Sequence, residues 1–324
     1  MDSRCTSGEF GVIASLRRRL GGGRRGVHGI GDDAVLLHRS DGRVVCTDTM
    51  VEGVHFRLDW SSPADVGWKL IAANVSDLWA CGAEPRAWTL SMSVPSHCEP
   101  LAGLASRLAD GVEEALQAFG VEAHLVGGDT TTSPSSLVLS VCMVGAVPEG
   151  RFLTRGGACA GDGIWLSGEP GWAAAGLHLL LSGGGAFEGV AARRALDAHR
   201  RPHPVRVPGS ALVAGRVHAA IDLSDGLSSD LWHVALASEA ALHVDRALLE
   251  AEALHEVPGA TEELVERWLL GGGDDHVMAV VSADAPGPDW RRVGEVTRVG
   301  EADLILRDRG GNRRRLEPGG HRHF

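Results

Sequence analysis

Aspartates recur along this chain in short stretches that also hold glycine, serine or threonine. The set comprises Asp32, Asp33, Asp48, Asp77, Asp129, Asp222 and Asp225. Carboxylate, hydroxyl and backbone carbonyl oxygens are the ligands that hard cations such as Mg²⁺ prefer in proteins. Each aspartate by itself is equally typical of a solvated turn or a helix cap. A metal site therefore requires that the fold bring several of them together.

Asp77 is the member whose surroundings are least polar. It lies in the stretch 69–85, where Ile71, Val75 and Leu78 recur at helical spacing on one side. This pattern predicts a helix that is apolar around most of its circumference and therefore buried. A buried, ionised carboxylate is costly unless a cation or hydrogen bonds compensate it. Asp77 therefore either caps a nearby loop or binds a metal ion.

Two or three consecutive glycines precede two of the acidic stretches. Gly127 and Gly128 stand before Asp129, and residues 271–273 stand before Asp274. Glycine lets the backbone come close to a phosphate or a metal and leaves its N–H groups accessible as donors. At Gly127 the pattern predicts a turn after a short strand, and that turn serves either a ligand or a simple hairpin.

Strand and helix patterns alternate along the chain. Helices are predicted at 8–20, 69–85, 101–119 and 187–200, and from residues 172 and 227 onward. Strands are predicted at 35–37, 44–46, 86–95, 137–144, 164–166 and 277–280. The alternation is typical of an α/β fold with acids at its strand ends. A length of 324 residues fits two domains, and the turn at 148–150 predicts their limits as 1–148 and 149–324.

Composition narrows the class of partner. A net charge of −11 disfavours nucleic acid and anionic membranes, because both require a basic face on the protein. An anionic substrate would need metal ions to mediate its binding. Lys69 is the only lysine, so the chain lacks the Gly-Lys-Ser/Thr phosphate loop and any nucleotide chemistry must use another architecture.

The sequence also constrains where the protein is located and whether its cysteines form disulfides. No apolar run approaches the roughly 20 residues that span a bilayer, and the N-terminal segment lacks the order of parts of a signal peptide. We therefore expect a cytoplasmic protein without membrane association. The six cysteines show no C-x-x-C spacing, so we expect neither disulfides nor a zinc site.

Five groups of residues occur in an order and spacing that resemble the thiamine-monophosphate kinases over nearly the whole chain. They are Gly29-Ile30-Gly31-Asp32-Asp33-Ala34; Thr47-Asp48-Thr49 with Gly53-Val54-His55-Phe56; Asn74-Val75-Ser76-Asp77 with Gly82-Ala83-Glu84-Pro85; Gly127-Gly128-Asp129-Thr130-Thr131; and Asp222-Leu223-Ser224-Asp225-Gly226-Leu227. Several are shared with aminoimidazole-ribotide synthetase, selenophosphate synthetase and the hydrogenase-maturation dehydratase. Val54-His55-Phe56, the loop 272–275 and the terminal His-Phe favour the thiamine branch.

The resemblance implies an α/β (α+β), two-domain, aminoimidazole-ribotide synthetase-like fold. It further implies a homodimer whose N-terminal domains, which bind metal and ATP, join their sheets into a barrel. The implied reaction is the ATP-dependent phosphorylation of thiamine monophosphate to thiamine diphosphate, by direct in-line transfer with several Mg²⁺ ions.

Site residues follow from the resemblance position by position. The implied metal ligands are Asp33, Cys46, Thr47, Asp48, Asp77, Asp129, Asp222 and Asp225. The implied contacts with ATP are Gly128, Asp129, Arg155 and Ser224, and Arg155 would also assist transfer. The implied contacts with thiamine monophosphate are His55, Asp274 and His321.

The chain departs from the family's pattern at the substrate end. Asp274-Asp275-His276 stands where Glu-Asp-Tyr is usual, His321 replaces an aromatic residue, and Cys46 replaces a common serine. An alternative activity is that of another ATP-dependent synthetase or dehydratase of the superfamily, acting on an amide or carbonyl substrate. A nucleotide-binding dimer without catalysis is a weaker alternative, because binding alone does not require so many carboxylates.

Overall fold

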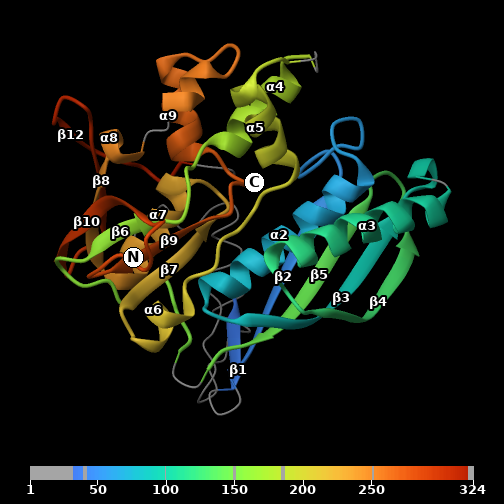
Figure 1. Cartoon of the computed structure of the whole chain (residues 1–324), viewed down its shortest axis with the longest axis horizontal. Helices are drawn as coiled ribbons and strands as arrows, with labels where there is room; N and C mark the ends of the chain where they lie inside the picture. The colour runs from blue at the N-terminus through green and yellow to red at the C-terminus, as the bar shows by residue number, and fades with distance from the viewer. Residues whose placement is uncertain are drawn as a thin grey trace.

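The structure, a computed structural model, describes residues 32–38, 42–98, 100–148, 151–183, 187–249 and 252–319. The predicted helix at 8–20 and His321 lie outside these residues. Two sheets divide the described chain, one before residue 147 and one after residue 162. Figure 1 shows the two sheets side by side, each with its own helices.

The first sheet has five strands in the order β1-β2-β5-β3-β4. Their bounds are β1 Val35–His38, β2 Arg43–Val51, β3 Glu84–Val94, β4 His124–Thr132 and β5 Val138–Ala146. Two long helices, α2 Pro63–Ala80 and α3 Leu101–Phe119, cover one face of this sheet (Figure 1), and a short 3₁₀ turn η2 spans Ser96–Cys98. Strand β4 pairs with β3 in parallel and forms one edge of the sheet.

The second sheet has seven strands in the order β12-β11-β8-β10-β6-β9-β7. Its strands are β6 Gly163–Leu166, β7 Val217–Leu223, β8 Ala240–Asp245, β9 Val277–Ser282, β10 Arg291–Val299, β11 Asp303–Arg307 and β12 Arg313–Arg315. The accompanying helices are α4 Trp172–Leu181, α5 Val190–Arg200, α6 Gly209–Val213, α7 Leu227–Ser238, α8 Arg246–Leu249, η3 Glu252–Glu256 and α9 Glu262–Gly271. Strands and helices thus mix in both halves, which confirms the predicted α/β class.

The predicted helix at 69–85 is wrong at both ends. Helix α2 begins at Pro63 because Ser62 and Asp65 form a reciprocal capping box, which compensates the first free N–H groups of the helix. It ends at Ala80, since Gly82 adopts a φ of 76° and the chain turns into β3. The helix therefore places Asp77 in its last turn, next to the strand ends.

The predicted turn at Gly127 is also wrong. Gly127 and Gly128 lie inside strand β4, which continues to Thr132. A Cβ on Gly128 would lie 2.2 Å from the carbonyl oxygen of Leu90 on β3. The glycine is therefore needed for the close approach of two strands rather than for a reversal of the chain.

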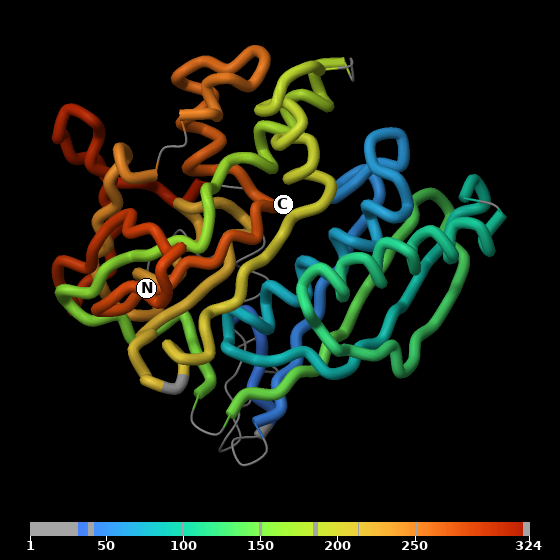
Figure 2. The backbone as a smooth tube through the Cα atoms, viewed as in Figure 1, coloured from blue at the N-terminus to red at the C-terminus, as the bar shows by residue number. Residues whose placement is uncertain are grey.

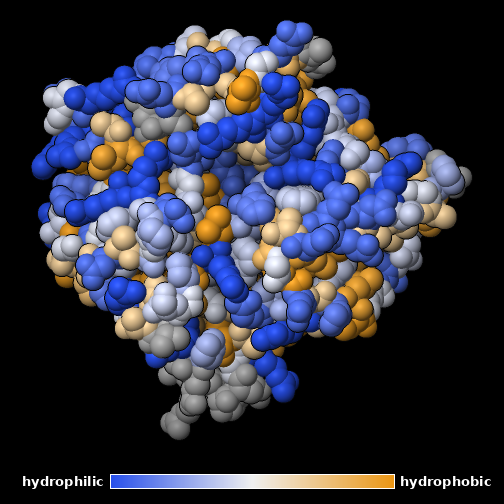
Figure 3. Space-filling view, in the orientation of Figure 1, coloured by the Kyte–Doolittle hydropathy of each residue, from blue (hydrophilic) through white to orange (hydrophobic). Residues whose placement is uncertain are grey.

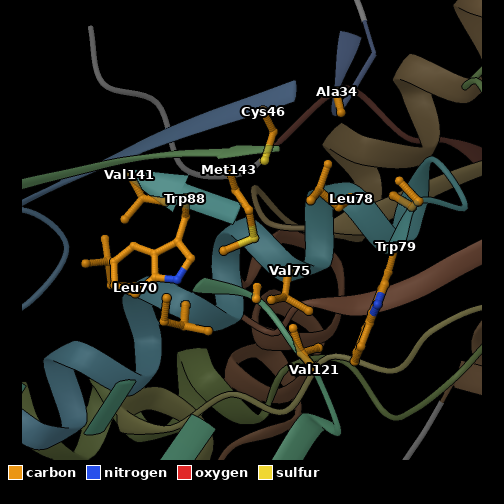
Figure 4. Packing of buried hydrophobic residues seen from close by; sticks show 14 of the residues in the cluster. Ala34, Cys46, Leu70, Val75, Leu78, Trp79, Trp88, Val121, Val141 and Met143 are labelled. Atoms are coloured by element: carbon orange, nitrogen blue, oxygen red, sulfur yellow. The ribbon is translucent and has the colours of Figure 1, made fainter. Parts of the chain in front are cut away.

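The largest hydrophobic cluster surrounds α2 and reaches into the second half. Figure 4 shows Leu70, Val75 and Leu78 of α2 packed against residues of the first sheet, including Met143. The same cluster contains Val207, Val217, Ala220, Met278, Val280 and Trp290 from the second half. Burying these residues in one cluster stabilises the two halves against each other. The limit between domains at 148 and 149 stays a prediction.

A connecting segment also joins the halves. Residues 201–207, between α5 and α6, run along the first half as the yellow tube in Figure 2. The indole Nε1 of Trp68 donates to the carbonyl oxygen of Pro202 at 2.7 Å. Arg201 bonds to Asp65, so this segment holds the first half of α2 at two neighbouring positions.

The surface shown in Figure 3 is hydrophilic for the most part, with hydrophobic residues scattered across it. Within the described ranges, no helix combines the length and the apolar character needed to cross a bilayer.

The crossing of α2 and α3 leads to a stability prediction. A Cβ on Gly111 would lie 1.8 Å from the carbonyl oxygen of Ala64, so Gly111→Ala must force the two helices apart. Overpacking of this kind typically costs about 1–3 kcal/mol or more. Gly103→Ala on the same helix is the matched control, because its Cβ would meet only Pro100 at 3.7 Å. Urea unfolding should show a loss for Gly111→Ala and a small gain for Gly103→Ala; equal effects would contradict the close crossing.

Candidate metal and substrate site

A cavity of about 900 Å³ lies where the two halves meet. Its walls come from β2 and the segment after it, from helices α2, α4 and α5, from the end of β7 with the loop after it, and from the loop before β9. Among its lining residues are Asp48, His55, Lys69, Asp77, His199, Asp222, Ser224, Asp225, Asp274 and His276. Residues distant in sequence therefore share one acidic cavity, as the metal-site hypothesis requires.

Three carboxylates form the centre of the site. Asp33 precedes β1, Asp77 lies in the last turn of α2, and Asp222 lies near the end of β7. Each offers one oxygen, and these atoms lie within 4.8 Å of one another. Asp48 on β2 lies beside this group, since it hydrogen-bonds to Asp77. Oxygen ligands at this spacing fit a Mg²⁺ ion held by carboxylates.

Burial and mutual repulsion perturb these acids. Burial raises the pKa of Asp33 to about 7, against the opposing effect of Arg155. The pKa of Asp77 is raised well above its usual range by burial first and then by Asp48 and Asp222. Burial likewise raises the pKa of Asp48. Such a cluster cannot be fully ionised at neutral pH without cations, which is the electrostatic signature of a site that binds them.

Arg155 approaches the centre from the second half. Its guanidinium donates to Asp33 at 2.5 Å, and its backbone N–H donates to Asp32 at 2.8 Å. Burial alone would lower the pKa of Arg155, but Asp33 outweighs it and raises that pKa. Arg155 therefore stays charged beside the carboxylates.

The loop after β7 is fixed by a buried acid. The carboxylate of Asp230 on α7 accepts from the backbone N–H groups of Asp225 and Gly226 at 3.1 and 3.0 Å. Burial raises the pKa of Asp230 well above its usual range. These bonds hold Ser224 and Asp225 at the cavity wall.

Two predicted substrate residues, His55 and Asp274, line the same cavity. Nδ1 of His55 accepts from the N–H of Val51 at 3.0 Å, which fixes the ring. The ammonium of Lys69 donates to the carbonyl oxygen of His55 at 3.2 Å and to Asp274 at 2.8 Å. Together, His55 and Asp274 form one wall.

The loop 271–276 carries strained backbone. Asp274 and His276 adopt φ values of 65° and 50°, which residues other than glycine rarely adopt. Their N–H groups donate to the carbonyl oxygens of Ser224 and Leu223, respectively, at 2.8 and 2.9 Å. These bonds hold the strained conformation at the end of β7, and strain of this kind is concentrated at functional sites.

Asp275 and His276 of this loop have structural partners. Asp275 accepts from the N–H groups of Gly171 and Ala173 and so caps α4, although burial raises its pKa to about 7. The ring of His276 lies 3.2 Å from Asp222. His276 thus supports a carboxylate of the central cluster from outside.

Four further predicted site residues, Cys46, Thr47, Gly128 and Asp129, are neither among the described lining residues of the cavity nor in the group of three carboxylates. Gly128 and Asp129 lie on the exposed strand β4 and are not among the residues described as lining the cavity. The Thr47 hydroxyl donates to the carbonyl oxygen of Val141 at 2.8 Å. The buried Cys46 thiol contacts Asn74, and burial raises its pKa well above its usual range.

Several site residues were missed by sequence reasoning. Lys69, Asp230, Asp275 and His276 all contact predicted site residues or fix their loops. For Lys69 a usable signal existed, because a single lysine within an apolar helix needs a buried anionic partner. Asp230 carried none, because its role depends on a turn whose geometry only the fold reveals.

His199 at the cavity wall gives a pH-dependent stability. Burial first, and then Lys69, lower its pKa from 6.5 to about 4. The unfolded chain therefore takes up a proton on His199 as the pH falls below 6.5, while the folded protein does not until about pH 4. Across this window folding should lose up to about 3 kcal/mol. Urea unfolding at several pH values should show a shallower loss for His199→Gln; equal slopes would contradict a buried neutral imidazole.

Comparison with known proteins gives consistent relationships. The family model "AIR synthase related protein, N-terminal domain" matches residues 31–147. The thiamine-monophosphate kinase of Escherichia coli (strain K12) is 37% identical over 334 residues, covering 98% of each chain. That of Mycobacterium tuberculosis (strain ATCC 25618 / H37Rv) is 38% identical over 296 residues, covering 89% of this chain and 85% of the relative. A solved structure, "AaThiL complexed with AMPPCP and TMP", is similar with a TM-score of 0.82 at 29% identity, covering 100% of this chain and 99% of that one.

Proposed function

Since the chain belongs to the thiamine-monophosphate kinase family, we propose that it transfers the terminal phosphoryl group of ATP to thiamine monophosphate and forms thiamine diphosphate. The observation that carries this proposal is the cluster of Asp33, Asp77 and Asp222 beside Arg155, next to a cavity between the two halves that Asp77 and Asp222 line. A solved relative is complexed with AMPPCP, an ATP analogue, and with TMP, which supports the same pair of substrates.

The donor set fits Mg²⁺. Its acids are buried, their pKa values are raised, and their oxygens converge within 4.8 Å. Bound cations would therefore stabilise the ionised carboxylates and the folded protein. We assign Asp33, Asp48, Asp77, Asp222 and Asp225 as the carboxylates that would hold several ions. When bound, Mg²⁺ neutralises the phosphate charges. ATP and a phosphate monoester together carry about six negative charges.

The chain's own residues then act by position and charge. Arg155 would place its guanidinium against the phosphate oxygens of ATP, and Ser224 on the wall of the cavity would offer its hydroxyl to the nucleotide. The acceptor phosphate is already ionised, so no protein nucleophile or general base is required. Transfer is direct and in line, with alignment of the two phosphates supplying much of the rate.

At the substrate end, His55 and Asp274 would contact thiamine monophosphate. Both line the cavity, and their positions are fixed by Val51 and Lys69, respectively. His321, outside the described residues, is assigned to the same end by the family resemblance.

We include a homodimer in the proposal because strand β4 is exposed along its whole length. It carries Leu125 and Val126, which are 56% and 66% exposed. In the sheet register Asp48 and Gly128 are separated by two intervening strands, β5 and β3, a distance of about 14 Å. Within the sheet of one chain, Gly128 and Asp129 are therefore too far from Asp48 to share a ligand with it. Sheets joined through a second copy, as a barrel across the dimer, would cover β4 and could complete their role.

The test is a substrate panel with the purified protein, ATP and Mg²⁺. Thiamine diphosphate formed from thiamine monophosphate supports the proposal. ADP release only with an amide-bearing or carbonyl-bearing metabolite would instead indicate the synthetase or dehydratase activity of the wider superfamily. We further place the enzyme in the cytoplasm, where its co-substrate ATP is held.

A further inference from the structure

Lys69 differs from the arginines of the chain in the kind of cation it carries. It is the only lysine, it lies on the largely apolar helix α2, and it is only 4% exposed. A buried ammonium is costly unless it is paired and hydrogen-bonded. Lys69 meets that condition through Asp274 at 2.8 Å and the carbonyl oxygen of His55 at 3.2 Å.

These two bonds join three separate elements. Helix α2 belongs to the first half, His55 follows β2, and Asp274 lies in the strained loop before β9 of the second half. The side chain of Asp274 is 37% exposed while that of Lys69 is 5% exposed, so the pair lies in the cavity wall with its carboxylate toward the opening. Lys69 thereby holds two groups of the proposed substrate end in fixed relative positions.

The charges at this end favour the same interpretation. Burial alone would raise the pKa of Asp274, but Lys69 and His276 outweigh it and hold that pKa below its usual range. The neighbouring His199 is neutral at pH 7, because its pKa is lowered to about 4. Asp274 therefore stays ionised largely through Lys69, and an ionised acid is suited to a cationic ring of the thiamine type.

A purely structural ion pair is the alternative. Buried ion pairs are often replaceable by apolar residues without loss of stability, so stability alone does not explain a lone lysine at this point. The position of the pair, at the cavity wall with both partners of Lys69 assigned to the substrate, distinguishes it from the other ion pairs that join the halves. Arg206 and Glu84, for example, are 58% and 47% exposed and are not among the residues that line the cavity.

We propose that Lys69 is a positioning residue for the acceptor substrate, setting the carboxylate of Asp274 and the segment of His55 across the boundary between the halves. This inference rests on the proposed function. It assigns no direct contact between Lys69 and a phosphate. It requires that loss of Lys69 weaken the binding of thiamine monophosphate selectively and leave ATP binding nearly intact.

The test uses Lys69→Met, which keeps the length of the side chain and removes the charge. KM for thiamine monophosphate should rise about tenfold to a hundredfold, while KM for ATP changes less than about twofold. Calorimetric titration with thiamine monophosphate should show the same loss of affinity without turnover. Lys69→Arg keeps the charge and should recover part of the affinity, and it serves as the test if Lys69→Met fails to fold.

Two further variants distinguish a positioning role of Lys69 from a purely stabilising role. Arg206→Met removes an ion pair between the halves outside the cavity and should leave both KM values unchanged. Asp274→Asn combined with Lys69→Met should be no worse than either single variant, because the two residues act as one unit. A fall in kcat or melting temperature with KM for thiamine monophosphate unchanged would overturn the positioning role. A wild-type protein that forms no thiamine diphosphate would overturn the proposed function instead.

Discussion

Asp77→Asn is expected to reduce the rate of phosphoryl transfer by about a thousandfold or more, equivalent to about 4 kcal/mol of transition-state stabilisation. Asp77 lies at the centre of the carboxylate group, within 4.8 Å of Asp33 and Asp222 and hydrogen-bonded to Asp48. A neutral amide is a poorer ligand for Mg²⁺ than a carboxylate. The loss should persist at saturating ATP and be only partly relieved by added Mg²⁺.

The same substitution should leave the metal-free protein at least as stable as the wild type. Burial and the neighbouring acids raise the pKa of Asp77 in the folded protein, so the folded protein holds that proton more tightly than the unfolded chain does. In the metal-free protein, the stability that this proton contributes is therefore present at low pH. It is lost as the pH rises above 3.8 toward the pKa of Asp77 in the folded protein. The amide cannot ionise, so the variant's advantage should widen with pH.

Two measurements check these expectations. Steady-state rates with ATP, Mg²⁺ and thiamine monophosphate test the first, and urea unfolding with a chelator at several pH values tests the second. Asp110→Asn, at an exposed position on α3, is the matched control and should change neither quantity. Wild-type activity in Asp77→Asn would remove Asp77 from the metal site. A large loss of metal-free stability would show that its charge is compensated in the folded protein without metal.

Arg155→Met should lower kcat/KM for ATP by about a hundredfold, or about 2.7 kcal/mol. The guanidinium lies against Asp33 and is the cation that the second half brings to the metal centre. Removing one partner of a buried ion pair often costs roughly 3–5 kcal/mol of stability. The cost here should be smaller, because Asp33, whose pKa is raised to about 7, can accept a proton once its partner is lost.

The kinetic and stability effects of Arg155→Met can be separated. KM for ATP is measured together with the free energy of unfolding, at neutral pH and at lower pH, where Asp33 is protonated more fully. Arg107→Met, exposed on α3, is the control for loss of an arginine. A large loss of stability with KM for ATP unchanged would make Arg155 a structural residue only.

Much of this site could be predicted from sequence because its residues lie at the ends of regular elements. Asp77 on an apolar helix and Asp222 at the end of an apolar strand are recognisable without coordinates, and α3 matches its predicted limits of 101–119. The β period and the helical period fix which face each side chain occupies. The convergence of Asp33, Asp77 and Asp222 then follows from topology.

The other features of the fold and the site could not be predicted, because most of them depend on contacts between segments that are distant in the sequence. Strand β4 looks like a turn at Gly127 because glycine at a close strand contact and glycine in a reversal leave the same local pattern. The capping box of Ser62 and Asp65 precedes the apolar stretch 69–85, so a prediction based on that stretch places the start of α2 too late. The pairing of Lys69 with Asp274 joins residues separated by 205 positions, and no local pattern records such a contact.

The single lysine also makes the chain unusual toward reagents that acylate amines. Apart from the terminal amine, Lys69 is the only such target, and in the folded protein its ammonium is buried and bonded to Asp274. Acylation then requires that α2 and the loop 271–276 separate. The rate of acylation at Lys69 therefore measures how often the two halves open. Thiamine monophosphate bound across that boundary would slow the reaction, which makes Lys69 a built-in chemical probe of cavity opening that needs no added label.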